Sequence, residues 1–566
     1  MRSAGTTPQG MVGQDEAVGA RARSLSPIVD NPPVAEVVAD RTELSPPPVI
    51  GLLIPFYLMP GRSSLYRILG VCAVAVSRIA FRSHLLYDVD SVNFALALRR
   101  FDPAAHQPHP PGYFLYVCLG RLVNLLIPDA NAALVAISIA ASCGAAWMIH
   151  LLTEEWFGER PALVALVLFL VSPLCWFHGI VALTYIVEAF FSALVGYLCW
   201  KVYTGNKAFL APASLAFALA AGFRQSSGLL LAPLWLLSIW RMDWPRRWLA
   251  LLVAGAGMLA WFLPMAVAAG GIGPYFASLA HLWLTIPAQR TTLSSPALAV
   301  ARLVTIGWVF VLCFGAAVPF LFQGLKSLAG RSRDRRTFTW VWIAPGFLFF
   351  TFVFFGFINS GYLLLLSPPL FAWLSVRIYA FLGTERHALL RRAALAAGLA
   401  VNCAVFLWTP LYCSYGSVRH FERTLPAITR DFREHLDPAK TLIIGFDSHF
   451  LGYRHAGYYL PEFVTVQYPE VSYNDGRRVF LMHAGDTQVV RYFDAAGFDR
   501  FAIFPLPEGG EYTAHEKKAR DKLPAGVLRT AVIGESKVLV GPVSALPLLF
   551  PSTVAIQRQS SVRPPD

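Results

Sequence analysis

The chain has 566 residues, of which 56% are apolar and only 14% are charged, with a mean hydropathy of +0.52. A soluble globular protein carries about 25% charged residues, so this composition excludes an ordinary soluble domain. Repeated apolar runs of roughly 20 residues predict instead a polytopic helical membrane protein. The net charge is +13, and the excess arginines and lysines lie in loops that flank these runs. This distribution is typical of the positive-inside rule and argues against nucleic-acid binding.

Residues 1–48 are rich in Pro, Ala, Ser and charge and show no periodicity, which predicts a disordered cytoplasmic tail. They contain no signal-peptide core. Residues 49–410 are predicted to form the transmembrane domain. Its eleven predicted spans lie at about 64–82, 131–152, 161–178, 180–203, 208–223, 226–240, 248–270, 300–323, 338–358, 361–381 and 391–410.

The apolar stretch 112–127 is a candidate for a twelfth span, but the loop charges argue against it. With eleven spans and the N-terminus inside, the inner loops collect most arginines and lysines, including those of 241–247 and 331–336. A twelfth span at 112–127 would move these Arg-rich loops outside, against the positive-inside rule. We therefore expect a helix within the outer leaflet, inside a first outer loop that covers 83–130.

The composition changes after residue 410, where polar and apolar residues mix. Residues 411–545 are predicted to form a small α/β domain outside the membrane, followed by a disordered tail at 546–566. A helical pattern covers 417–436, and β-like runs lie at Thr441–Phe446, Val479–Met482, Phe501–Phe504 and Lys537–Val540.

The eight cysteines lie in or just beyond apolar segments and show no Cys/His spacing typical of a metal site. The sequence therefore predicts neither a disulfide framework nor a zinc site, and small buried thiols are expected. The sequence identifies no cofactor, and it leaves open whether a divalent cation is needed.

Two carboxylates, Asp88 and Asp90, follow the first predicted span. Charge at a membrane boundary is costly and usually marks a function. Asp90 is predicted to cap a helix over 91–100. It is also a candidate general base, because a carboxylate can take the proton of a hydroxyl group that attacks a substrate. A cap would hold that side chain in place, so the two roles are compatible.

A His/Pro-rich segment follows, in which Pro108, Pro110 and Pro111 predict an extended turn and disfavour a helix. The turn is either a rigid connector or the wall of a pocket in which His109 faces Asp90. In the second interpretation, His109 helps to bind a phosphate or a sugar.

Four further residues are candidates for the same pocket. Tyr185 and Glu188 share one helical face, where they either make a helix–helix hydrogen bond or contact a sugar or its acceptor. Arg224 and Arg290 either hold a phosphate leaving group or contact lipid headgroups. The predicted topology collects the unusual polar residues at the outer boundary: Asp88, Asp90, His106, His109, His178, Tyr185, Glu188, Arg224, Gln225, His281, Gln289, Arg290, Asn359 and Tyr362.

The segment Asp90-Ser91-Val92-Asn93-Phe94-Ala95, followed by His109-Pro110-Pro111-Gly112-Tyr113, resembles the first outer loop of the GT-C glycosyltransferases. It is most similar to bacterial members related to protein O-mannosyltransferases and to the aminoarabinose transferases of lipid A. The family's catalytic aspartate falls on Asp90. Many relatives have Asp-Glu there, whereas this chain has Asp90-Ser91 and an additional Asp88, so the base stays open between the two aspartates.

The resemblance implies an inverting transferase in a bacterial inner membrane, with its site on the periplasmic face. It would move a sugar from a polyprenyl-phosphate donor to a hydroxyl or amine of a glycan, lipid or protein. His109, Glu188, Tyr185, Arg224 and Arg290 would bind the sugar and phosphate. The alternatives are a transporter or flippase of a lipid-linked sugar and an assembly protein that binds through its outer domain. Transporters tend to carry repeats and midplane sites, which this sequence does not show.

Overall fold

The computed structural model gives the positions of residues 63–555 with several interruptions. Outside the described residues lie 1–62, 104–105, 286–295, 322, 324–332, 384–386, 411, 447, 469–470, 475–478, 483–492, 495–496, 506–516, 518, 550–553 and 556–566. The predicted disordered tail 1–48 and the predicted site residues Gln289 and Arg290 fall on undescribed segments. The prediction of a disordered tail at 546–566 was wrong at its start, because Leu546–Leu549 form the short helix α21, in which Leu546 and Leu549 are buried.

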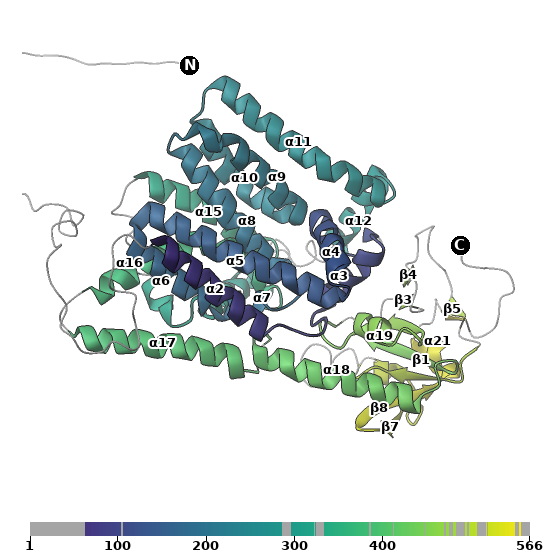
Figure 1. Ribbon diagram of the computed structural model, residues 1–566. Coiled ribbons are helices and arrows are strands. Elements are labelled where there is room, and N and C mark those ends of the chain that lie inside the picture. Colours follow the sequence, from purple (N-terminus) through teal and green to yellow (C-terminus); the bar gives the residue numbers. More distant parts are fainter. Residues whose placement is uncertain are drawn as a thin grey trace, which may run out of the picture. The chain divides into compact units, whose positions relative to one another are not determined.

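Residues 63–408 are almost entirely helical, as predicted for the membrane domain (Figure 1). The helices are α2 (Ser63–Ala80), α3 (Val89–Arg99), α4 (Phe114–Leu126), α5 (Ala130–Phe157), α6 (Glu159–Leu170), α7 (Pro173–His178), α8 (Tyr185–Tyr203), α9 (Leu210–Phe223), α10 (Gln225–Trp240), α11 (Trp244–Ala268), α12 (Ile272–Thr285), α13 (Ala297–Phe314), α15 (Arg333–Phe352), α16 (Ser367–Leu382) and α17 (Ala388–Trp408).

Each predicted span corresponds to one of these helices, but two spans are interrupted. The span predicted at 161–178 breaks after Leu170, because Ser172 caps a new short helix whose first residue is Pro173. The span predicted at 361–381 begins as the 3₁₀ helix η6 (Ser360–Leu365) before α16 starts.

Within the described ranges, five helices are long and apolar enough to cross a membrane: Ala130–Phe157, Tyr185–Tyr203, Trp244–Ala268, Ala297–Leu321 and Ala388–Trp408. The helix in the stretch 112–127, α4, has 13 residues, whereas a span needs about 20. Helices at other predicted spans are similarly short, such as α9 with 14 residues, so the position of α4 within one leaflet stays a prediction. The fold class is therefore a helical multi-pass membrane domain followed by an α/β unit, as predicted.

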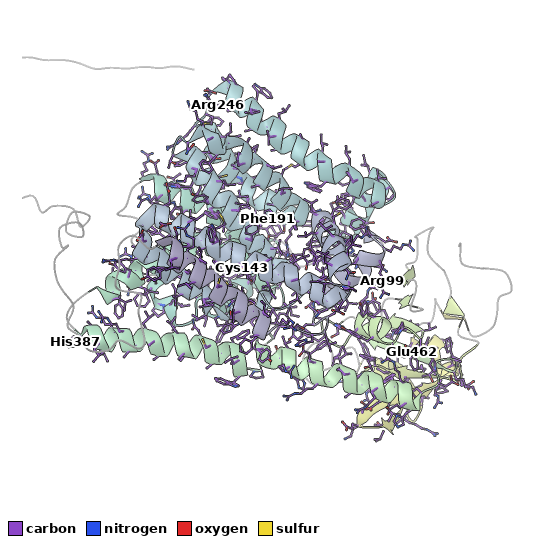
Figure 2. The ribbon with its side chains drawn as sticks, viewed as in Figure 1. Arg99, Cys143, Phe191, Arg246, His387 and Glu462 are labelled. Carbon is purple, nitrogen blue, oxygen red and sulfur yellow. The ribbon has the colours of Figure 1, made fainter. Side chains whose placement is uncertain are left out.

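Helices α5 and α8 form the centre of the helical part, where Cys143 and Phe191 lie (Figure 2). Small residues let neighbouring helices approach closely. Gly196 of α8 is one such position, because an added Cβ atom would lie 1.8 Å from the ring of Trp342. By contrast α17 is mostly exposed, as expected of a helix that faces lipid.

The C-terminal part contains a seven-stranded mixed sheet with the order β4-β3-β2-β1-β6-β8-β7. Strand β1 is parallel to β2 and β6, and the other pairs are antiparallel. The strands are β1 (Thr441–Phe446), β2 (Thr465–Tyr468), β3 (Val471–Asn474), β4 (Val479–Met482), β6 (Arg500–Ile503), β7 (Arg529–Ile533) and β8 (Ser536–Pro542). The four predicted strands correspond to β1, β4, β6 and β8, whereas β2, β3 and β7 were not predicted.

Helix α18 (Tyr415–His435) follows α17 in nearly the same direction and packs beside the sheet (Figure 1). The short helix α19 (Tyr453–Tyr459) lies between β1 and β2 in the chain and contacts α3. The C-terminal part therefore reaches the loop that carries the two predicted aspartates.

Candidate functional site

Asp88, not Asp90, caps the helix after the first span. Helix α3 begins at Val89, two residues earlier than predicted, and the Asp88 Oδ1 atom accepts a hydrogen bond of 2.9 Å from the Asp90 amide. This is the usual N-cap geometry, in which a side-chain oxygen satisfies an amide of the first turn. The prediction that Asp90 caps a helix over 91–100 was therefore wrong.

The second oxygen of Asp88 is also engaged. Its Oδ2 atom accepts a hydrogen bond of 3.1 Å from the Tyr412 hydroxyl and lies 3.6 Å from Nδ1 of His449. Burial raises the pKa of Tyr412 well above its usual value, so this hydroxyl keeps its proton and stays a donor. Only 4% of the Asp88 side chain is exposed, which leaves this carboxylate little access to a substrate.

Asp90 lies in the first turn of α3, where the helix dipole favours a negative charge. Its Oδ1 atom lies 3.2 Å from Nδ1 of His109, and 24% of its side chain is exposed. Burial acts to raise the pKa of Asp90, but the nearby His109 charge outweighs this effect and leaves the pKa below its usual range. Asp90 is therefore an ionised carboxylate with an accessible side.

The His109 ring connects Asp90 to Tyr113. Its Nε2 atom lies 3.1 Å from the Tyr113 hydroxyl. In the charged ring Nε2 donates to this hydroxyl, whereas in the neutral ring with its proton on Nδ1 the hydroxyl donates to Nε2. Tyr113 adopts a left-handed backbone conformation with φ of 45° at the start of α4. A non-glycine residue held in that region is often part of a functional site.

The predicted Pro-rich turn is held in place from two directions. The Pro111 carbonyl accepts hydrogen bonds from Nε2 of Gln225 at 3.2 Å and from the Tyr275 hydroxyl at 3.1 Å. Gly112 has φ of 109°, a conformation that other residues rarely adopt. The turn is therefore a fixed connector that places His109 beside Asp90, and its role as the wall of a pocket stays a prediction.

Glu188 and Arg224 form a buried ion pair, with 3.5 Å between Oε2 and Nε. Ser227 donates a hydrogen bond of 2.8 Å to Oε1 of Glu188, which is the helix–helix hydrogen bond considered for this residue. Arg224 also donates a hydrogen bond of 3.0 Å to Thr184. The arginine is only 4% exposed, so its position is that of an internal cation and not of a lipid-facing side chain.

Three tyrosine rings surround the Arg224 guanidinium. Its carbon atom lies 4.2 Å from the ring centre of Tyr362, 4.5 Å from that of Tyr185 and 5.6 Å from that of Tyr113. Such contacts stabilise a cation through the ring quadrupoles. Tyr113 therefore belongs to both clusters and connects Arg224 to the Asp90–His109 pair.

The C-terminal part fixes the segment that precedes α3. The amide of Val89 donates to the His449 carbonyl at 2.9 Å, the amide of Leu86 donates to the Tyr459 hydroxyl at 2.9 Å, and that of His84 donates to Glu422 at 2.6 Å. Three amides around the aspartates thus bind groups that lie more than 330 residues later in the chain.

The structure brings together Asp88, Asp90, His109, Tyr185, Glu188, Arg224, Gln225 and Tyr362, all predicted at one boundary. Arg290 lies outside the described residues, and the side chain of His281 is not described. Tyr412 and His449 were not predicted, although both are polar residues at the ends of predicted elements. In the described ranges, no group of three His, Cys, Asp or Glu residues could hold a metal ion.

No protein-family model matches the chain, and no curated protein sequence matches it. Among solved structures, ArnT from Cupriavidus metallidurans bound to undecaprenyl phosphate matches with a TM-score of 0.55 at 12% identity. The match covers 85% of this chain and 98% of ArnT. The same protein without ligand matches with a TM-score of 0.53 over the same shares of both chains, also at 12% identity. These matches show that the chain has the predicted GT-C fold.

Proposed function

We propose that the protein is a GT-C glycosyltransferase that uses a polyprenyl-phosphate sugar as donor. The shared fold with ArnT, which was solved with undecaprenyl phosphate, supports this class of donor. The observation that carries the proposal is the ion pair of 3.2 Å between the accessible carboxylate of Asp90 and His109, at the boundary of the helical domain. The acceptor is a hydroxyl or amine of a glycan, lipid or protein at the periplasmic face of a bacterial inner membrane.

In the proposed reaction, Asp90 takes the proton of the acceptor hydroxyl. The acceptor oxygen forms a bond to the anomeric carbon of the sugar from the face opposite the lipid phosphate. The bond between that carbon and the phosphate oxygen breaks, and polyprenyl phosphate leaves with the electron pair. The sugar is therefore transferred with inversion, which needs one general base and no covalent enzyme intermediate.

Asp90 is a better base than Asp88 for two reasons. Asp88 is 4% exposed, and both of its oxygens are engaged, one by the helix amide and the other by Tyr412. Asp90 keeps 24% of its side chain exposed. A base must reach the proton that it removes, and only Asp90 meets this condition.

The other predicted residues receive roles that follow their positions. His109 and Tyr113 hold the Asp90 carboxylate in orientation through the contacts at 3.2 Å and 3.1 Å. Tyr185 and Glu188 form the wall behind them and fix Arg224. Arg224 is separated from the leaving phosphate by the tyrosine rings, and its positive charge stabilises the negative charge that develops on that phosphate. Arg290 remains the candidate for direct contact with the phosphate.

The test uses membranes that contain the wild type, Asp90→Asn or Asp88→Asn, supplied with polyprenyl-phosphate sugars. Covalent transfer by the wild type and its loss in Asp90→Asn would support the proposal. Movement of the intact donor across proteoliposome membranes without covalent transfer would instead support the flippase alternative. Mass spectrometry of surface glycans and glycoproteins from a deletion strain would identify the sugar and its acceptor.

A further inference from the structure

A second candidate site lies at the other end of helix α8. Its first residue, Tyr185, contacts Arg224 in the site described above, and its last residue, Tyr203, lines a cavity of about 560 Å³. A helix of 19 residues is about 28 Å long, close to the thickness of the hydrocarbon core. The cavity therefore opens at the opposite face of the membrane from Asp90.

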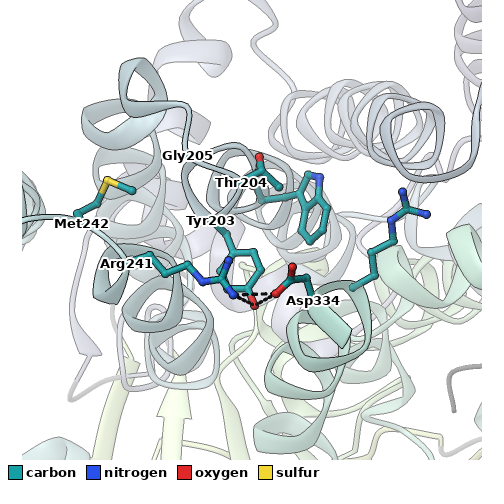
Figure 3. A pocket seen from close by; sticks show the side chains of 8 residues that line it. Tyr203, Thr204, Gly205, Arg241, Met242 and Asp334 are labelled. Atoms are coloured by element: carbon teal, nitrogen blue, oxygen red, sulfur yellow. Dashed lines mark hydrogen bonds and ion pairs between the residues drawn. The ribbon is translucent and has the colours of Figure 1, made fainter. Parts of the chain in front are cut away.

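The cavity is lined by aromatic rings and ionised side chains (Figure 3). Arg241 lies 3.8 Å from the ring centre of Tyr203 and forms an ion pair of 2.7 Å with Asp334, which also accepts a hydrogen bond of 3.0 Å from the Tyr203 hydroxyl. Trp200 and Arg335 also line the cavity, where their side chains can contact a ligand. The Arg241 and Asp334 side chains are 47% and 55% exposed, so their pairing leaves the cavity open.

The surroundings of the cavity carry an excess of positive charge. Residues 240–248 and 333–336 contain six arginines and two aspartates. The positive-inside rule places such a segment at the cytoplasmic face, where the membrane surface is rich in anionic lipid. A ligand with a negative charge would therefore be attracted to this end of the protein.

Exposed tryptophans indicate the depth at which the cavity lies in the bilayer. Trp240, Trp244 and Trp248 are 73%, 66% and 64% exposed, and such residues gather at the headgroup level. The Arg247 guanidinium lies 5.1 Å from the ring centres of both Trp240 and Trp244. The arginines and the aromatic rings thus lie at the level where phospholipid phosphates are found.

We propose that this cavity binds the headgroup of an anionic phospholipid, with Arg241 and Arg335 contacting its phosphate. Arginine presents paired N–H donors that match phosphate oxygens. The size of the cavity, its positive surroundings and its position at the interface favour a bilayer lipid over a soluble anion. The sugar donor does not fit this role, because its phosphate would lie one membrane thickness away from Asp90.

The proposal does not depend on glycosyl transfer and is tested by lipid binding to the purified full-length protein. Native mass spectrometry and thermal unfolding are measured with phosphatidylglycerol, cardiolipin, phosphatidylcholine, undecaprenyl phosphate and inorganic phosphate. We expect phosphatidylglycerol or cardiolipin to bind and raise the unfolding temperature. Equal binding of phosphatidylcholine would overturn the proposal, as would a preference for undecaprenyl phosphate or an equal effect of inorganic phosphate.

Variants then locate the binding. Replacing both Arg241 and Arg335 by Gln should weaken binding roughly 30-fold. Each arginine near the membrane surface strengthens the attraction to anionic lipid by about fivefold, and the two effects multiply. Arg391→Gln is the matched control, since this arginine begins the predicted span 391–410, lies outside the cavity lining and should leave binding unchanged. Unchanged binding in the double variant would contradict the assignment.

Asp334→Asn separates lipid binding from a structural effect. It removes the carboxylate that competes with a lipid phosphate for Arg241, while its amide oxygen can still accept the Tyr203 hydrogen bond. Tighter lipid binding is therefore expected, whereas a purely structural role of the ion pair predicts weaker binding. Weaker binding in a correctly folded Asp334→Asn protein would overturn the proposal.

Discussion

The Oδ1 atom of Asp88 accepts a hydrogen bond of 2.9 Å from the backbone amide of Asp90. The first aspartate thus ends the loop and starts helix α3, and the second stands on the first turn with its carboxylate beside His109. Only one residue separates the two aspartates in the sequence, yet they have different positions in the structure and, we propose, different roles.

The capping role of Asp88 can be tested by stability. Asp88→Ala removes the cap and should lower the free energy of unfolding by about 1 kcal/mol, with a further cost from the unpaired Tyr412 hydroxyl. Asp88→Asn keeps an oxygen that can accept from the Asp90 amide, and asparagine is an equally good cap. Thermal unfolding in detergent should therefore rank Asp88→Ala well below Asp88→Asn. Equal losses in the two variants would contradict the capping role.

The electrostatic role of His109 predicts a change in pH dependence. His109→Gln removes the cation that keeps the pKa of Asp90 below its usual range. The pKa should then rise, so the acidic limb of the kcat/KM profile should move to higher pH in the variant. An unchanged limb in a folded variant would mean that His109 does not tune Asp90.

The same shift has a consequence for stability. Because the pKa of Asp90 is lower in the folded protein than the value of about 3.9 in an unfolded chain, Asp90 stabilises the fold above about pH 4. That contribution is lost as the pH falls through the folded pKa. Unfolding temperatures measured between pH 7 and pH 3 should therefore fall less in Asp90→Asn than in the wild type.

The buried pair of Glu188 and Arg224 predicts strong coupling. Replacing either residue alone, by Gln or Met respectively, leaves one buried charge unpaired and should destabilise the protein by about 3–5 kcal/mol. The double variant should cost less than the sum of the two single variants. If the loss of stability in the double variant, measured by its unfolding temperature, equalled the sum of the losses in the two single variants, the two charges would not depend on each other.

The C-terminal domain is predicted to influence the proposed base through His449. This side chain lies 3.6 Å from Asp88, and its charge also lowers the pKa of Asp90, after the larger effect of His109. His449→Gln should therefore move the acidic limb of the kcat/KM profile to higher pH, but by less than His109→Gln does. His420→Gln, an exposed histidine on α18 of the same domain, is the control and should leave the profile unchanged. Identical profiles for His449→Gln and the wild type would contradict the influence.

Much of the fold follows from local patterns in the sequence. Apolar runs located the helices, and short β-like runs located β1, β4, β6 and β8. Strand β2 was missed because its four residues, Thr465–Tyr468, include the polar Thr465 and Gln467, so the run is short and weakly apolar although the fold buries all four residues. The helix start at Val89 was misjudged because either aspartate is a suitable cap by residue type alone.

The partners in the site depend on distant contacts that local patterns do not contain. The charges at Glu188 and Arg224 both pointed to a function, but their pairing arises only when α8 packs against the junction of α9 and α10. Tyr412 and His449 reach Asp88 across more than 320 residues of chain. By contrast, the proximity of Asp90 and His109 was one of the two interpretations offered for the Pro-rich turn, since the two residues are separated by only one short helix.

The most direct test of the proposed base is the rate of sugar transfer by Asp90→Asn, with Asp88→Asn as the control. Asparagine has nearly the same shape as aspartate but cannot accept the acceptor's proton. The account predicts that Asp90→Asn, purified with a normal unfolding temperature, transfers sugar at least roughly 100-fold more slowly than the wild type. Asp88→Asn should stay within about tenfold of the wild type, because it keeps the cap. Wild-type transfer by Asp90→Asn would contradict the account.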